Sequence, residues 1–180
     1  MRSDFLLFVS QVNIEIKAKC NEHQSIREFL KSSNADYKGS DHQIDTYFKV
    51  SRGRLKLREG NIENCLVYYE RDDESGPKQS NVILFQNQPD SSLKEILTRS
   101  LDVLVVVDKQ REIYFINNVK FHLDNVKDLD CFVEIEAIDK TGNLSKNILL
   151  EQCDFYMKML NISKNDLVSC SYSDLLLQKQ

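Results

Sequence analysis

The sequence predicts an α+β fold built around a mostly antiparallel β-sheet. One observation is the order of the expected elements, which runs strand, helix, several strands, helix, several strands, helix. A second is the alternation of apolar and polar residues through the middle of the chain, which is the period of a β-strand. A third is the absence of the regular βαβ alternation of a Rossmann fold and of the nucleotide-binding loops GxGxxG and GxxxxGKS/T.

The first third of the chain should contain two strands around one helix. Residues 11–19 alternate, residues 22–33 are expected to form the helix, and residues 44–50 alternate again. We expect His23 and His42, which fall in this part, at the surface, where polar side chains usually lie.

The middle third should contain, in chain order, strands at 54–59 and 65–71, a loop at Asp72–Pro77, a second connection at Phe85–Ser92 and a helix at 91–101. Pro89 and Asp90 supply the turn signal of the second connection. Ser92 is the expected N-cap of the helix, and Glu95 three residues later would complete a capping box.

The last third should contain strands at 104–116, 118–126 and 131–138, a helix at 143–161, and a short helix or packed extension at 167–177. The helix at 143–161 carries one apolar stripe, which we expect in the core: Leu149, Leu150, Cys153, Met157 and Leu160. Tyr47 and Tyr114 lie on expected strands, and we expect them to pack rather than to catalyse.

Length and composition limit the function classes. The 180 residues argue for a single domain, with residues 1–10 and 165–180 as terminal extensions. A content of 41% hydrophobic and 29% charged residues is typical of a globular protein and not of a disordered one. The net charge of -4 argues against a nucleic-acid partner, although it allows a local basic site.

The cysteines and the N-terminal residues bear on location. The five cysteines are widely spaced and include no CxxC pair, so a zinc cluster is not expected, and free thiols fit a reducing cytoplasm. The apolar run Phe5–Val9 is shorter than the about 7–15 residues of a signal peptide or the about 20 of a membrane span. We therefore expect a cytoplasmic protein without a membrane partner.

Charged residues recur at every second position of several expected strands. Side chains on a strand alternate between its two faces, so each of the following rows shares a face opposite apolar residues: Asn13, Glu15, Lys17 and Lys19; Arg54, Lys56 and Arg58; Lys109 and Arg111; Lys120, His122 and Asp124; Glu134 and Glu136. An antiparallel sheet with one solvated face shows the same pattern, and for any single strand that is the simpler interpretation.

The rows taken together favour a second arrangement. Like charges at adjacent positions of one face repel each other. Such rows are therefore unfavourable unless a ligand compensates their charge. In a closed barrel the charged face would line the interior, and the apolar face would point outward beneath helices. A barrel of about eight strands holds one small ligand. Basic groups there would bind an oligoanion and carboxylates a divalent cation, with His122 hydrogen-bonded inside.

Six motifs in order resemble the CYTH superfamily, the triphosphate tunnel metalloenzymes, which include class IV adenylyl cyclases and thiamine triphosphatases. The segments are 13–17, which is similar to the family's ExExK opening, and 43–48, 53–58, 109–114, 122–126 and 132–136. Together they cover roughly residues 11–160. Residues 171–176 resemble the ending of cyclase-like members.

The resemblance implies a closed eight-stranded antiparallel β-barrel with a charged interior and flanking helices, and it implies roles for individual residues. The triphosphate-binding residues would be Lys17, Arg54, Lys56, Arg58, Arg71, Lys109 and Arg111, with Arg54 and Arg71 flanking the matched motifs. Glu134 and Glu136 would hold Mg²⁺ or Mn²⁺, with Asp124 and Glu15 completing the acidic cluster. Lys17 and Glu15 would be catalytic.

Three functions remain open at this point. The first is metal-dependent hydrolysis of a triphosphate such as tripolyphosphate or thiamine triphosphate, which we place first because attack by water needs fewer contacts than a positioned ribose. The second is a class IV type adenylyl cyclase that converts ATP to cyclic AMP and pyrophosphate, which the C-terminal motif favours. The third is a non-catalytic module that binds polyphosphate or nucleotide. Asn13 favours it, because the family has glutamate there and an amide weakens a second metal site. A monomer and a homodimer are equally compatible with the sequence.

Overall fold

The computed structural model describes residues 9–21, 23–71, 76–89 and 91–180, with side chains from residue 12 onward. In chain order the elements in these ranges are β1 (Val9–Lys19), α1 (Gln24–Ser32), β2 (Asp36–Phe48), β3 (Arg54–Gly60), β4 (Cys65–Arg71), β5 (Lys78–Gln86), α2 (Leu93–Leu101), β6 (Val103–Ile116), β7 (Val119–Val126), β8 (Cys131–Asp139), α3 (Lys146–Met159), the 3₁₀ turn η1 (Lys164–Asp166) and α4 (Tyr172–Leu177).

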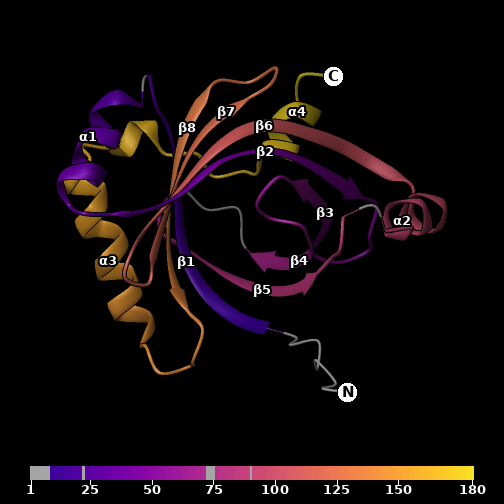
Figure 1. Cartoon of the computed structure of the whole chain (residues 1–180), viewed down its shortest axis with the longest axis horizontal. Coiled ribbons are helices and arrows are strands. Elements are labelled where there is room, and N and C mark those ends of the chain that lie inside the picture. Colours follow the sequence, from indigo (N-terminus) through magenta and orange to yellow (C-terminus); the bar gives the residue numbers. More distant parts are fainter. Residues whose placement is uncertain (1–8, 22, 72–75, 90) are drawn as a thin grey trace.

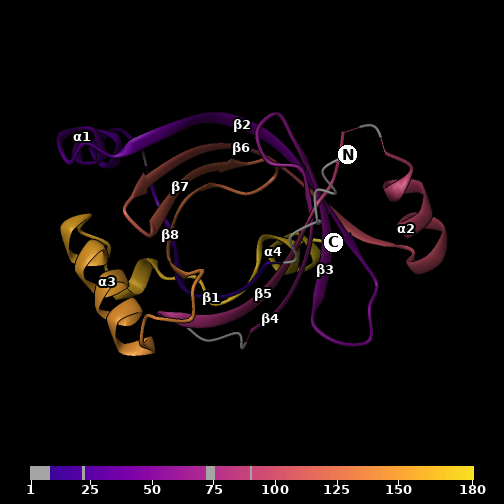
Figure 2. The same ribbon diagram turned by 60° about the horizontal axis from the view of Figure 1, so that its bottom comes forward.

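The strands close into one antiparallel barrel in the order β1-β5-β4-β3-β2-β6-β7-β8, and β8 pairs back with β1. Figure 2 shows the ring that they form. The register between β1 and β8 places Glu15 opposite Glu136 and Lys17 opposite Glu134. The prediction of a closed eight-stranded antiparallel barrel is therefore confirmed, and a surface sheet with one solvated face is excluded.

The apolar outer face of the barrel packs against α1 and α3, which lie on the same side of the molecule (Figure 1). Ile14 and Ile16 of β1, Phe121 of β7, Leu30 of α1 and Leu149 of α3 are each at most 1% exposed and belong to one cluster. Burial of one such side chain contributes roughly 1.5–3 kcal/mol to stability. The charged face consequently has to line the barrel interior.

The strand β5 is absent from the seven strands that the sequence patterns predict. Lys78 and Ser80 point into the barrel and are buried, while Gln79 and Asn81 lie on the opposite face. Because both faces of this half of the strand are polar, the alternation of apolar and polar residues disappears. The prediction that the connection begins at Phe85 is wrong, because β5 continues to Gln86.

The strand β2 begins at Asp36, well before the predicted start at residue 44. Its first half pairs with β6, and Asp36 lies opposite Phe115. This half has few buried residues, so its pairing with β6 leaves no hydrophobic period in the sequence. In the predicted loop Asp72–Pro77, residues 72–75 lie outside the described part of the chain.

The four α-helices fall within the segments predicted to be helical or, for α4, a short helix or packed extension. Ser92 is the N-cap of α2 as predicted, but its side chain makes no capping hydrogen bond. The predicted capping box is therefore wrong, and Glu95 instead pairs with Arg99, with 2.7 Å between Oε1 and Nη2. The apolar stripe of α3 is confirmed, because Leu149 and Cys153 are buried in the core cluster and the other three residues pack against it.

No helix in the described ranges is long and apolar enough to cross a membrane. The apolar run Phe5–Val9 lies outside the described residues except for the backbone of Val9. All five cysteines lie in described ranges, and no disulfide joins them.

Candidate functional site

The barrel encloses a cavity of about 340 Å³ that is lined mainly by the charged face of the strands. Most of the predicted site residues border it: Glu15, Lys17, Lys56, Arg58, Arg71, Lys109, Arg111, Glu134 and Glu136. Arg54 and Asp124 are not among the described residues that line it. The structure thus brings together side chains from β1, β3, β4, β6 and β8 that are far apart in the sequence.

Three of the predicted phosphate-binding side chains share Asp45 of β2 as a partner. Its carboxylate accepts hydrogen bonds from Lys109 Nζ at 2.7 Å, Lys56 Nζ at 2.9 Å and Arg58 Nε at 2.8 Å. Burial would raise the pKa of Asp45, but the neighbouring cations hold it well below its usual value. Burial also lowers the pKa of Lys109 to about 7, although Asp45 opposes that shift. The sequence patterns did not assign Asp45 to the site.

A second group of ion pairs surrounds Glu134 of β8. Glu134 Oε2 accepts a hydrogen bond from Arg111 Nη2 at 2.7 Å and lies 3.1 Å from His122 Nδ1, and Lys17 Nζ lies 3.4 Å from Oε1. Burial lowers the pKa of His122 to about 3, with help from Arg111, so this imidazole is neutral near pH 7. The prediction that His122 hydrogen-bonds inside the barrel is confirmed.

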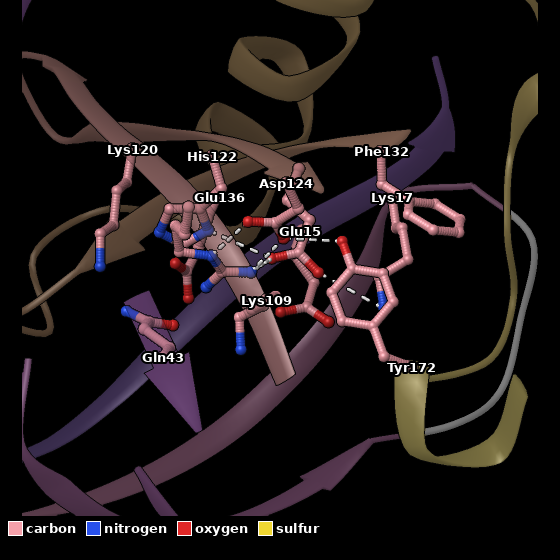
Figure 3. Close-up of polar contacts among 12 residues, drawn as sticks. Glu15, Lys17, Gln43, Lys109, Lys120, His122, Asp124, Phe132, Glu136 and Tyr172 are labelled. Carbon is pink, nitrogen blue, oxygen red and sulfur yellow. Dashed lines mark hydrogen bonds and ion pairs between the residues drawn. The ribbon is translucent and has the colours of Figure 1, made fainter. Parts of the chain in front are cut away.

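Asp124, predicted as a metal ligand, is fully buried beside Arg111. It accepts a hydrogen bond from Arg111 Nε at 2.6 Å and another from the Tyr172 hydroxyl at 2.7 Å (Figure 3). These contacts place Asp124 behind Arg111, so it orients that guanidinium.

The environment of Glu136 differs from that of the other carboxylates. Within the described residues it forms no ion pair, and it accepts a hydrogen bond from the side-chain amide of Asn13. Burial raises the pKa of Glu136, the carboxylates of Glu15 and Glu134 add to that shift, and Lys120 opposes it. Glu15, directly opposite on β1, is paired with Arg71.

A divalent cation fits this donor set in one particular way. No three His, Cys, Asp or Glu side chains in the described ranges form a ready metal cluster. Mg²⁺, however, is often held by one or two carboxylates together with water and substrate phosphate oxygens. Glu136 has no ion-pair partner within the described chain. Together with Glu134 or Glu15 it provides two carboxylates, which is part of the ligand set of such a cation.

The C-terminal segment lies against the barrel interior at one end, and α4 appears within the outline of the ring in Figure 2. The Tyr172 ring packs on Phe132 with 4.9 Å between centroids, and Lys17 Nζ lies 3.7 Å from the Tyr172 ring centroid (Figure 3). Lys78 Nζ donates to the Ser169 carbonyl at 2.6 Å. Arg54, a predicted phosphate ligand, donates to Asp174 at 3.0 Å.

Two further expectations have different outcomes. His23 is only 5% exposed, and its Nε2 lies 3.0 Å from the carbonyl oxygen of Phe132, so the predicted surface position is wrong. Its place between α1 and β8 depends on tertiary packing, which a single polar residue in the sequence does not reveal. His42 is exposed as predicted, and its Nε2 lies 2.7 Å from Asp108.

Comparison with known proteins identifies the family. The CYTH domain model matches residues 11–172, and the chain belongs to the CYTH family, whose members include adenylyl cyclase-like enzymes and triphosphatases. It is 24% identical over 172 residues to a Methanocaldococcus jannaschii protein named "putative adenylate cyclase", a match that covers 91% of this chain and 98% of the relative.

Solved structures agree with the fold. A conserved hypothetical protein from Pyrococcus furiosus has a TM-score of 0.78 at 24% identity, covering 91% of this chain and 99% of that one. A Hippeastrum protein, described as a "putative adenylyl cyclase" with a dominant triphosphatase activity, has a TM-score of 0.61 at 11% identity, covering 94% and 96%. At these identities the structures establish the shared barrel.

Proposed function

We propose that this protein is a divalent-metal-dependent enzyme that hydrolyses a triphosphate bound in the barrel. The observation that carries the proposal is the convergence of basic side chains from five strands on one cavity, beside a carboxylate that has no ion-pair partner in the described chain. Phosphoryl transfer requires chiefly positioning of the phosphates and neutralisation of their charge. A closed barrel with fixed cations meets both requirements.

The roles of the residues follow from their chemistry. Arg58, Arg71 and Arg111 would form paired contacts with phosphate oxygens, whereas Lys56 and Lys109 would act as point charges. Bound Mg²⁺ or Mn²⁺, held by Glu136 with Glu134 or Glu15, would neutralise charge on the phosphate oxygens. The further predicted roles, with Arg54 and Lys17 as phosphate ligands, Asp124 in the acidic cluster and Lys17 and Glu15 in catalysis, stay predictions.

The cyclase reaction is the second candidate, and the relative's name together with the C-terminal motif around Tyr172 favours it. In that reaction the ribose 3′-hydroxyl would attack the α-phosphorus of ATP and release pyrophosphate. A binding module without turnover is the third candidate, and the hydrogen bond from the Asn13 amide to Glu136 favours it. A neutral amide at this position supplies no negative charge to a second cation.

One incubation separates the three functions. The purified protein is mixed with Mg²⁺ or Mn²⁺ and with tripolyphosphate, thiamine triphosphate or ATP, and phosphate, pyrophosphate and cyclic AMP are measured. We expect phosphate release from at least one substrate. Cyclic AMP with pyrophosphate from ATP would establish the cyclase instead, and no product from any substrate would leave the binding module.

We further expect a single cytoplasmic domain, monomeric or homodimeric, with no nucleic-acid or membrane partner.

A further inference from the structure

Glu63, in the loop between β3 and β4, directs its carboxylate into the cavity, although it lies outside every motif of the family resemblance. Its Oε2 accepts a hydrogen bond from Arg58 Nη1 at 2.8 Å, and its Oε1 accepts one from Lys120 Nζ at 2.5 Å. One loop carboxylate therefore joins a predicted phosphate ligand on β3 to a lysine on β7.

Buried polar groups fix the position of this loop. Asp41 is fully buried, and its two carboxylate oxygens accept hydrogen bonds from the backbone N–H groups of Ile62 and Glu63 at 2.9 and 3.0 Å. Gln43, also fully buried, donates to Asp41 at 2.8 Å and to Glu63 at 3.2 Å. A side chain at Gly60 would place its Cβ 2.7 Å from Asp41 Oδ1. Buried polar groups are costly unless they are paired, so this network strongly favours one position of Glu63.

Lys120 has a second carboxylate within reach. The β7–β8 register places Lys120 directly opposite Glu136, and opposite residues of an antiparallel pair have Cβ atoms about 4.5–5.5 Å apart. Gln43 and Lys120 both donate hydrogen bonds to the Glu63 carboxylate. A Lys120 side chain released from Glu63 could therefore pair with Glu136.

We propose that Glu63 is a positioning residue that holds the Lys120 ammonium group and thereby leaves Glu136 available to a divalent cation. The inference rests on the metal site of the proposed function and adds to it two residues and a role. Glu63 would not touch the cation. It would act by keeping a competing positive charge in a fixed place.

The test is Mn²⁺ binding to the purified full-length chain, followed by electron paramagnetic resonance without any substrate. We expect Glu63→Gln to weaken Mn²⁺ binding about tenfold, within the usual range for residues that position metal ligands. Glu63→Gln combined with Lys120→Met should restore the binding. Glu59→Gln is the matched control, because Glu59 on β3 of the same hairpin forms a comparable but exposed pair with Lys94 of α2 at 2.6 Å.

A second double variant tests whether Mn²⁺ binding depends on pairing of Lys120 with Glu136 or only on the total charge of the cavity. Glu63→Gln with Lys140→Met has the same net charge as the double variant at Lys120, and Lys140 also lines the cavity while being exposed. The proposal is supported if Mn²⁺ binding is restored in the double variant that contains Lys120→Met and not in the one that contains Lys140→Met. Equal restoration by Lys140→Met, or unchanged Mn²⁺ binding in Glu63→Gln, overturns it. Failure of the wild-type chain to bind Mn²⁺, or unchanged binding in Glu136→Gln, instead refutes the proposed metal site and the inference with it.

Discussion

Glu134 and Glu136 are two residues apart on β8 and face the same cavity, yet their surroundings differ. Glu134 lies among Lys17, Arg111 and His122, and these partners hold its pKa well below the usual value against the opposing effect of burial. Glu136 has a raised pKa because of burial and neighbouring carboxylates. The ionised form of Glu134 is therefore favoured in the fold, whereas the ionised form of Glu136 is disfavoured unless a cation binds beside it.

Substitution of these two residues should therefore have different effects on the free energy of unfolding. We expect Glu136→Gln to abolish metal-dependent turnover without lowering the free energy of unfolding, because it removes a carboxylate whose ionised form is disfavoured in the fold. Glu134→Gln should lower the free energy of unfolding by roughly 1–3 kcal/mol, less than for a fully buried pair because its side chain is 21% exposed. Urea unfolding of both variants measures the difference, and equal losses of stability would contradict the assignment.

Lys109 should make ligand binding depend on pH. Its pKa of about 7 reflects burial against the opposing effect of Asp45. An added phosphate group would favour the charged lysine, so binding near pH 8 should take up protons. Affinity should fall by up to about tenfold per pH unit above the pKa. Calorimetry of tripolyphosphate binding in buffers of different ionisation enthalpy measures this uptake, and Lys109→Met should reduce it. The same uptake in Lys109→Met would assign it to another group.

The charged residues of the period-two rows were predictable from the sequence, but their partners were not. The period-two rows placed Lys17, Arg58 and Glu136 on the inner face, where the structure has them. Asp45 and Glu63 were missed because their importance depends on which strands lie opposite each other. Register and barrel closure are non-local properties, so the charge of an isolated residue does not reveal them.

At the scale of elements, the period-two pattern identified strands with one apolar face and failed where both faces were polar. β1 and β8 alternate clearly because their outer faces pack against α1 and α3. The first half of β5 is polar on both faces, since Lys78 and Ser80 point into a charged interior. The alternation of apolar and polar residues therefore does not detect a strand segment that is polar on both faces.

The helix α4 should contribute to the order of the site through Tyr172. Its hydroxyl donates to the fully buried Asp124 at 2.7 Å. Tyr172→Phe removes a hydrogen bond to a charged group, and we expect the free energy of unfolding to fall by about 1.5–3 kcal/mol. Tyr156→Phe on the half-buried face of α3 is the control, and its effect should be within about 0.5 kcal/mol. Chemical denaturation compares the two, and equal effects would show that the Tyr172 hydroxyl contributes little.

At the scale of the whole molecule, the barrel interior is close to charge balance despite its many cations. The net charge of -4 therefore describes mainly the outer surface. Inside, the ion pairs of Asp45, Glu63, Asp124 and Glu134 already compensate much of the basic charge. A triphosphate that enters alone adds several negative charges to this balanced interior.

A cation and a triphosphate should consequently bind with positive cooperativity, and the coupling must be reciprocal. We expect Mn²⁺ and a methylene-bridged triphosphate analogue together to raise the melting temperature by more than the sum of their separate effects, because each ligand stabilises the folded state in proportion to its affinity. Glu136→Gln should bring the joint effect down to that sum, since it removes the carboxylate assigned to the cation. The analogue alone could instead raise the melting temperature as much as the analogue and Mn²⁺ together. The basic residues would then suffice for triphosphate binding, and the cation would be required for the chemical step and not for charge balance.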